Sequence, residues 1–173
     1  MLGRFSRRFL SKGEKVPEMS VMLVTGSNGN YNFDLKAPVQ SGEFFKNKKV
    51  ILVGFPGAFT PVCTGTHLPG YIKYHEEIKK KGAEVVALAV NDPYVMQAYG
   101  KHLGGDITYL ADGNGEFTEA LDGGLDMRHK FLGFRTRRFA VIVDNGEITE
   151  VHDETGEDLS DISTVETLMK SLG

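Results

Sequence analysis

Short runs of apolar, β-branched residues alternate with amphipathic segments along much of this chain, and that alternation limits the folds open to it. The runs VILVGF (50–55) and EVVALAV (84–90) are too short for buried helices and are typical of buried central strands. Between and after them, GYIKYHEEIKKKG (70–82) and NDPYVMQAYGKHL (91–103) predict helices. DITYLAD (106–112) predicts a further strand. The order strand, helix, strand, helix, strand indicates the α/β class.

Antiparallel hairpins are predicted on both sides of this core. The segments 19–26 and 31–35 flank an Asn-Gly turn, which supplies the positive φ values that tight turns require. Residues 137–154 predict a second hairpin, and residues 160–172 predict a closing helix with Ser160 as its N-cap. We therefore expect a thioredoxin-like fold, with a central mixed β-sheet, helices on both faces and an N-terminal β-hairpin.

Length and composition fit a single compact domain. The 173 residues, 40% hydrophobic and 25% charged, can bury roughly two-thirds of their unfolded surface. We predict one domain over residues 16–173, preceded by a tail of residues 1–15. The tail carries Arg4, Arg7 and Arg8 among apolar residues and has no acidic residue in its first ten positions, which is typical of an organelle targeting segment. We predict a mitochondrial location, with the cytoplasm or another organelle as the alternative.

Charge and hydropathy argue against several classes of function. A net charge of −3 provides no general basic field for nucleic acid, so we predict no nucleic-acid partner. No apolar run approaches the roughly 18 residues of a membrane span, so we predict no membrane partner. The histidines lack ligand spacing, and DGNGEFTE (112–119) lacks two required positions of a calcium loop. We predict neither a metal nor a cofactor.

The only cysteine, Cys63, follows the first buried strand at the predicted start of a helix. In PGAFTPVCTGTHLP (56–69), Thr60 suits the N-cap and Pro61 the first helical position. Cys63 then falls in the first turn, where unpaired amide N–H groups and the helix dipole favour a thiolate. A helix terminus supplies only about 1 to 2 kcal/mol, so a cation should assist. We expect it from the arginines that precede the late strand (Arg135, Arg137 and Arg138).

Two other interpretations of Cys63 compete with a reactive thiol. Lone cysteines are often inert buried groups, and His67, one helical turn away, invites a Cys-His hydrolase pair. We favour the reactive thiol because an inert group needs neither a Thr-Pro cap nor nearby arginines, and we expect His67 to pack or hydrogen-bond near the pocket mouth. Pro69 should kink or break the helix near residues 65–68.

The segment PGAFTPVCTGTHLPGY (56–71) resembles the Pro-x-x-x-Thr-x-x-Cys active-site signature of the peroxiredoxins. Its spelling is similar to the subfamily that contains plant type II and mammalian mitochondrial peroxiredoxins. The agreement covers roughly residues 19–172, through VVALAVNDPYVMQAYG, YLADGNGEF and RRFAVIVDNGEI in the same order. The resemblance implies a thioredoxin-fold thiol peroxidase that reduces hydrogen peroxide and organic hydroperoxides and forms a homodimer.

Position by position, the resemblance assigns four site residues. Cys63 matches the peroxidatic cysteine, and Thr60 matches the threonine whose hydroxyl bonds the peroxide and the thiolate. Pro56 matches the proline that shields the pocket, and Arg138 the arginine that steadies the thiolate and polarises the peroxide. These roles agree with chemistry, since attack on an O–O bond needs a thiolate, oxygen-directed donors and stabilisation of the departing oxide.

One departure from the family pattern affects the second half of the reaction. Many relatives carry a resolving cysteine, but Cys63 is the only cysteine of this chain. A sulfenic acid on Cys63 would therefore be resolved by an external thiol such as glutathione, glutaredoxin or thioredoxin. We predict a one-cysteine peroxiredoxin. The alternative is a thioredoxin-fold redox sensor or binding module without rapid turnover.

Overall fold

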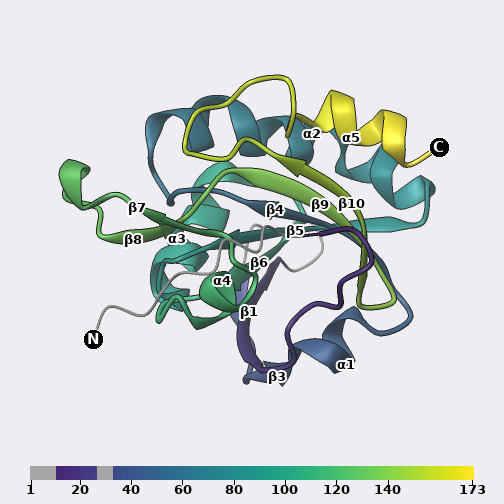
Figure 1. The fold of residues 1–173 in the computed structure, drawn as a ribbon, viewed down its shortest axis with the longest axis horizontal. Helices are drawn as coiled ribbons and strands as arrows, with labels where there is room; N and C mark the ends of the chain where they lie inside the picture. The colour runs from purple at the N-terminus through teal and green to yellow at the C-terminus, as the bar shows by residue number, and fades with distance from the viewer. Residues whose placement is uncertain (1–10, 27–32) are drawn as a thin grey trace.

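A single mixed sheet organises the chain in the computed structural model, which describes residues 11–26 and 33–173 (Figure 1). Within these residues the main strand order is β10-β9-β4-β5-β6-β1-β2, and β3 pairs with β1. The strands of this sheet are β1 (Ser20–Gly26), β2 (Phe33–Leu35), β3 (Val39–Gln40), β4 (Lys49–Gly54), β5 (Ala83–Ala89), β6 (Thr108–Ala111), β9 (Phe139–Asp144) and β10 (Glu147–Asp153).

The centre of the sheet is parallel and its flanks are antiparallel. β4 pairs in parallel with β5, and β5 with β6, because a helix connects each strand to the next. β9 runs antiparallel to β4 and to β10, while β1 runs antiparallel to β6 and to β2. The predicted mixed sheet is thereby confirmed. The predicted N-terminal hairpin is also confirmed in its strands, while its turn lies outside the described residues.

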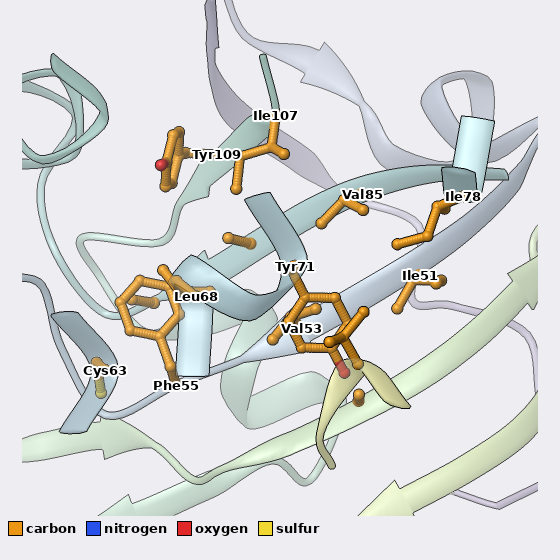
Figure 2. Packing of buried hydrophobic residues seen from close by; sticks show 14 of the residues in the cluster. Ile51, Val53, Phe55, Cys63, Leu68, Tyr71, Ile78, Val85, Ile107 and Tyr109 are labelled. Atoms are coloured by element: carbon orange, nitrogen blue, oxygen red, sulfur yellow. The ribbon is translucent and has the colours of Figure 1, made fainter. Parts of the chain in front are cut away.

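Helices cover both faces of the sheet. α2 (Leu68–Lys80), α3 (Pro93–Leu103) and α5 (Val165–Ser171) pack on one face, against alternate residues such as Ile51 and Val53. Figure 2 shows Leu68 and Tyr71 of α2 over this side of the sheet, with Cys63 at the end of the cluster. α1 (Ser41–Phe45) and α4 (Glu116–Ala120) cover the other face. The alternation arises because successive strand residues point to opposite sides.

Local signals in the sequence predicted the boundary of α3 correctly. Asp92 is the N-cap of α3, and its side chain accepts from the amides of Tyr94 and Val95 at 2.9 and 3.0 Å, with Pro93 at the first helical position. The chain before residue 16 already joins the domain: the Gly13 amide donates to Ile148 O at 2.8 Å. Residues before the predicted boundary at 16 therefore also contact the body of the domain.

The closing helix is shorter than predicted, and its predicted cap is wrong. α5 begins at Val165 with Thr164 at the N-cap. Ser160 instead donates to Glu154 Oε2 at 2.5 Å and accepts from the Ile162 amide at 3.2 Å. These contacts hold the segment before α5 as a loop rather than as a first helical turn.

A small hairpin that the sequence pattern did not predict precedes β9. β7 (Gly124–Asp126) and β8 (Phe134–Thr136) form a separate two-stranded sheet, with the short 3-10 helix η2 (Arg128–Lys130) between them. Figure 1 shows this hairpin projecting from the body of the molecule.

Along residues 11–26 and 33–173, no helix combines the length and apolar character needed to cross a bilayer.

Candidate active site

The pairing of β4 with β9 brings Cys63 and the arginine segment together. The two strands are antiparallel, with Gly54 opposite Phe139. The chain therefore leaves β4 at the same edge of the sheet where it enters β9. Residues just after Gly54 and just before Phe139 meet at this edge, although more than 70 positions separate Cys63 from Arg138 along the chain.

A tight loop carries the chain from β4 to the helix start. Pro56 is buried in the bend after the strand, and the Ala58 amide donates to Asn91 Oδ1 at 2.9 Å. Phe59 has a φ of +63°, which is unusual for an aromatic residue and marks a sharp reversal. The hydroxyl of half-buried Thr60 donates to Gly57 O at 2.8 Å. We refer to residues 56–60 as the approach loop.

Gly57 lets the approach loop lie close to the arginine segment. A Cβ at this position would lie 3.0 Å from Arg135 Nη1, which is tighter than an ordinary contact. Arg135 in turn donates to the backbone oxygens of Leu132 and Val90. Its guanidinium therefore holds loop carbonyls beside the approach loop.

The helix that carries Cys63 begins where the sequence predicted, and the disturbance predicted near residues 65–68 takes the form of a wider turn rather than a break. It starts at Pro61 and adopts a π-helical turn, η1 (Cys63–His67), before continuing as α2. The Leu68 amide donates to Cys63 O, five residues back, instead of to the residue four back. Pro69 has no amide hydrogen to continue the ladder, so the wider turn absorbs the change within one continuous helix.

Arg138 is the arginine that contacts the cysteine. Its Nη2 donates to Cys63 Sγ at 3.4 Å, its Nη1 lies 2.9 Å from His67 Nδ1, and its Nε donates to Glu157 O at 2.9 Å. The side chain is almost completely buried, with an exposed fraction of 2%. The guanidinium is therefore fixed from three directions, and one of its nitrogen atoms is directed at the sulfur.

The other two predicted arginines serve different contacts. Arg137 pairs with Asp153, with Nη2 and Oδ2 2.7 Å apart. Arg137 and Arg138 both lie just before β9 and reach different partners: Arg138 contacts Cys63 and His67, whereas Arg137 reaches Asp153 of β10. Of the three arginines, Arg138 is thus the one that the fold brings to the sulfur.

His67 is buried and pairs with Arg138 rather than with the cysteine. Burial and the nearby Arg138 guanidinium lower the pKa of His67 from 6.5 to about 4, so the imidazole is neutral at pH 7. Its Nδ1 accepts from Arg138, and its Nε2 donates to Ser163 O at 3.0 Å. This arrangement does not favour a Cys-His hydrolase pair, because Nδ1 has no lone pair left for a thiol. His67 thus packs and forms hydrogen bonds as expected, but it lies in the interior, with an exposed fraction of 3%, rather than at a pocket mouth.

The Arg138 charge has no carboxylate partner in the described part of the chain, where none of the ion pairs includes it. A buried cation is costly unless an anion compensates it. The Cys63 side chain has no exposed surface, which an inert core cysteine would also show. The contact with an uncompensated guanidinium is what separates Cys63 from an inert group.

Two contributors to the site were not identified from the sequence. Asn91 fixes the approach loop, and its position two residues after the end of β5, at the same sheet edge, was the available signal. Ser163 accepts from His67 and from the Tyr71 hydroxyl at 2.6 Å, but a backbone acceptor in a distant loop leaves no pattern in the sequence. Across residues 11–26 and 33–173, no group of three metal-ligating side chains is present.

Comparisons with known proteins agree with this arrangement. The sequence model of the Redoxin family matches residues 11–169. Peroxiredoxin-2C of Arabidopsis thaliana is 45% identical over 128 residues, which cover 72% of this chain and 78% of the relative. Peroxiredoxin-2E, chloroplastic, from the same plant is 37% identical over 168 residues, covering 94% and 69%. The crystal structure of the Plasmodium falciparum antioxidant protein, a 1-Cys peroxiredoxin, superposes with a TM-score of 0.84 at 31% identity, covering 94% and 98%.

The lowered pKa of His67 predicts a loss of stability in acid. Between pH 6.5 and about 4 the unfolded chain binds a proton on this imidazole that the folded chain resists, so stability falls as the pH falls. The full effect is about 3 kcal/mol. Urea denaturation at pH 7 and pH 4.5 should show a smaller acid loss in His67→Asn than in the wild type. His75→Asn, on the same helix, is the control; an equal acid loss in all three proteins would contradict this prediction.

Proposed function

Since this chain belongs to the peroxiredoxins of the Redoxin family, we propose that Cys63 is the thiolate with which it attacks peroxides. Thiol-dependent peroxidase activity, peroxide substrates and a thiol reductant follow from the family. The thioredoxin-like fold follows as well. The assignment of roles rests on one observation above all, the 3.4 Å contact between Arg138 Nη2 and Cys63 Sγ.

In the first step the Cys63 thiolate attacks one oxygen of the peroxide. The S–O bond forms as the O–O bond breaks, sulfur loses two electrons, and the other oxygen leaves as hydroxide or alkoxide, which takes up a proton. Charge therefore moves from sulfur to the departing oxygen. Arg138 is placed to stabilise the thiolate before attack, and its buried guanidinium can stabilise the developing oxyanion without reorganisation.

The approach loop supplies the remaining proposed roles. The Thr60 hydroxyl donates to Gly57 O, so its oxygen lone pairs can accept the O–H of a peroxide beside Cys63. Pro56 is buried and presents no amide hydrogen, which suits a wall that keeps water from the sulfur. Because the Cys63 side chain has no exposed surface, a peroxide reaches it only when the loop or the first helical turn moves aside.

In the second step an external thiol resolves the sulfenic acid. A thiol such as glutathione condenses with Cys63–SOH, which releases water and leaves a mixed disulfide, and a second thiol then exchanges to regenerate Cys63. Glutaredoxin or thioredoxin would serve in the same way. The single cysteine of the chain supports this route, because no other cysteine of the same sequence can act as resolver.

Two further proposals concern assembly and location. We propose that the protein forms a homodimer, as the family resemblance implies and as the exposed apolar side chains Phe59 and Val62 beside the site support. We also propose that the arginine-rich N-terminus directs the protein to an organelle, the mitochondrion first. Some relatives carry a chloroplastic designation, so plant-type organelles and the cytoplasm remain the alternatives.

Replacing Cys63 or Arg138 should show which side chains carry the reaction with peroxide. Cys63→Ser should abolish peroxide consumption, because the nucleophile is lost. Arg138→Met should slow the reaction of the reduced protein with hydrogen peroxide by roughly 100-fold or more, because charge stabilisation is lost. Stopped-flow measurement of the second-order rate constant tests both.

Arg128→Met is the matched control, since Arg128 is exposed and its guanidinium pairs with Asp126, two residues earlier. It should react at the wild-type rate. A wild-type rate constant no faster than that of a free thiol would favour the sensor instead. An unchanged rate in Arg138→Met would show that the cation is wrongly assigned.

The resolving thiol can be identified by the mass of the protein after one equivalent of peroxide. Without added thiol, we expect one extra oxygen on Cys63. With glutathione, we expect the mass of one glutathione joined through a disulfide, and further glutathione should return the reduced mass. Cys63→Ser should show neither change. A disulfide-linked dimer as the main product, in place of the glutathione adduct, would contradict resolution by an external thiol.

The proposed location can be tested by fusing residues 1–15 to a fluorescent protein. The fusion should enter mitochondria, whereas a version with Arg4, Arg7 and Arg8 changed to glutamate should stay in the cytoplasm. Uniform cytoplasmic fluorescence of the native fusion would refute the targeting role.

A further inference from the structure

We propose that His67 is a positioning residue of the peroxidase, whose neutral imidazole holds the Arg138 guanidinium so that Nη2 points at Cys63. This proposal rests on the roles proposed above for Cys63 and Arg138. It assigns to the Thr-His-Leu-Pro segment a function in the reaction, where the sequence alone suggested only packing or a hydrolase pair.

The geometry makes His67 the side-chain partner that orients Arg138. Of the three acceptors around the guanidinium, one is the reacting sulfur and one is the backbone oxygen of Glu157. The third is His67 Nδ1, 2.9 Å from Nη1. Nη1 and Nη2 share one rigid plane, so fixing Nη1 also fixes the direction in which Nη2 donates.

A neutral imidazole suits this place better than the alternatives. A protonated His67 would present an N–H to the Nη1–H of Arg138, and two donors would face each other. A carboxylate would bind the guanidinium strongly but would cancel the charge that Cys63 needs. Imidazole accepts through Nδ1 and leaves the positive charge of Arg138 uncompensated.

The groups around His67 keep it in the required tautomer. The Ser163 backbone oxygen accepts from Nε2, which leaves the Nδ1 lone pair for Arg138. The Tyr71 hydroxyl donates to the same oxygen at 2.6 Å, and its ring lies edge-on to the imidazole. Glu154 accepts from the Ser163 amide at 2.9 Å and so holds the loop in place. The charged groups that act on His67 are Arg138, which opposes its protonation, and Glu154, which favours it.

Removing the Nδ1 acceptor of His67 should slow the reaction with peroxide, because the Arg138 guanidinium would no longer be held in place. In His67→Leu the buried Nη1 loses its partner, and the guanidinium is free to turn away from Cys63. Misplacement by about 1 Å is enough to slow a reaction by about 100-fold. His67→Asn should recover much of the rate, because its side-chain oxygen can occupy the position of Nδ1 and accept from Arg138.

The test compares the rate constant with hydrogen peroxide, its pH profile and the thiolate ultraviolet absorbance in reduced full-length protein. We expect His67→Leu to be about 10- to 100-fold slower at pH 7, with a thiolate transition displaced to higher pH. His67→Asn should lie closer to the wild type in both measurements. His75→Leu and His75→Asn, on the same helix and away from the sulfur, should match the wild type. Thermal unfolding of every variant reports any simple loss of stability.

The outcomes separate this proposal from the proposed function. If Arg138→Met is slow while His67→Leu keeps the wild-type rate, the positioning role is refuted and the function stands. If Arg138→Met itself keeps the wild-type rate, the role of the arginine fails. Equal slowing of His67→Leu and His67→Asn with no change in the thiolate transition would indicate a merely structural role. Should His67→Leu not fold, His67→Gln replaces it: it reaches toward Ser163 and should be slower than His67→Asn.

Discussion

The contact between the buried guanidinium of Arg138 and the sulfur of Cys63 is the interaction on which the interpretation of this molecule depends. In the proposed reactive state the sulfur of Cys63 is a thiolate, and two opposite charges about 4 Å apart attract by about 4 kcal/mol at an effective dielectric constant of 20. That attraction must offset the cost of burying both groups, and it does so only with good geometry. The contacts of Arg138 to His67 and Glu157 provide that geometry, so the surrounding shell is as necessary as the charge.

The sheet, rather than the helix, brings this pair together. β4 ends where β9 begins, so the antiparallel pairing places the segment that follows β4 and the segment that precedes β9 at the same edge of the sheet. The helix then adds its first turn, and the π-turn between Cys63 and His67 sets both side chains toward the arginine. A helix start alone would give a cysteine a modest preference for the anion. The strand pairing adds a cation from more than 70 residues away and so makes the site specific.

Much of this arrangement could be predicted because its signals are local. The buried runs that became β4 and β5, the cap at Asp92 and the helix start at Thr60-Pro61 each depend on a few adjacent residues. The choice of Arg138 among three arginines came from the family resemblance, because Arg137 and Arg138 lie before β9, where strand alternation does not fix the direction of a side chain. The carbonyl of Ser163 and the neutral state of His67 arise from tertiary burial, which no short sequence pattern encodes.

In the proposed mechanism one sulfur reacts twice with partners of very different size, and this requirement bears on the approach loop. A peroxide is small, whereas a resolving thiol carries a peptide or a protein, yet the Cys63 side chain is completely enclosed. The loop is held by few polar contacts, including those of Ala58 with Asn91 and of Thr60 with Gly57, and it contains Phe59 at a positive φ. Such a segment opens at lower cost than the central strands beneath it. The central strands thus support Cys63 and Arg138 from beneath while the approach loop covers them, and in the proposed mechanism the larger second partner should depend more than the peroxide on displacement of that cover.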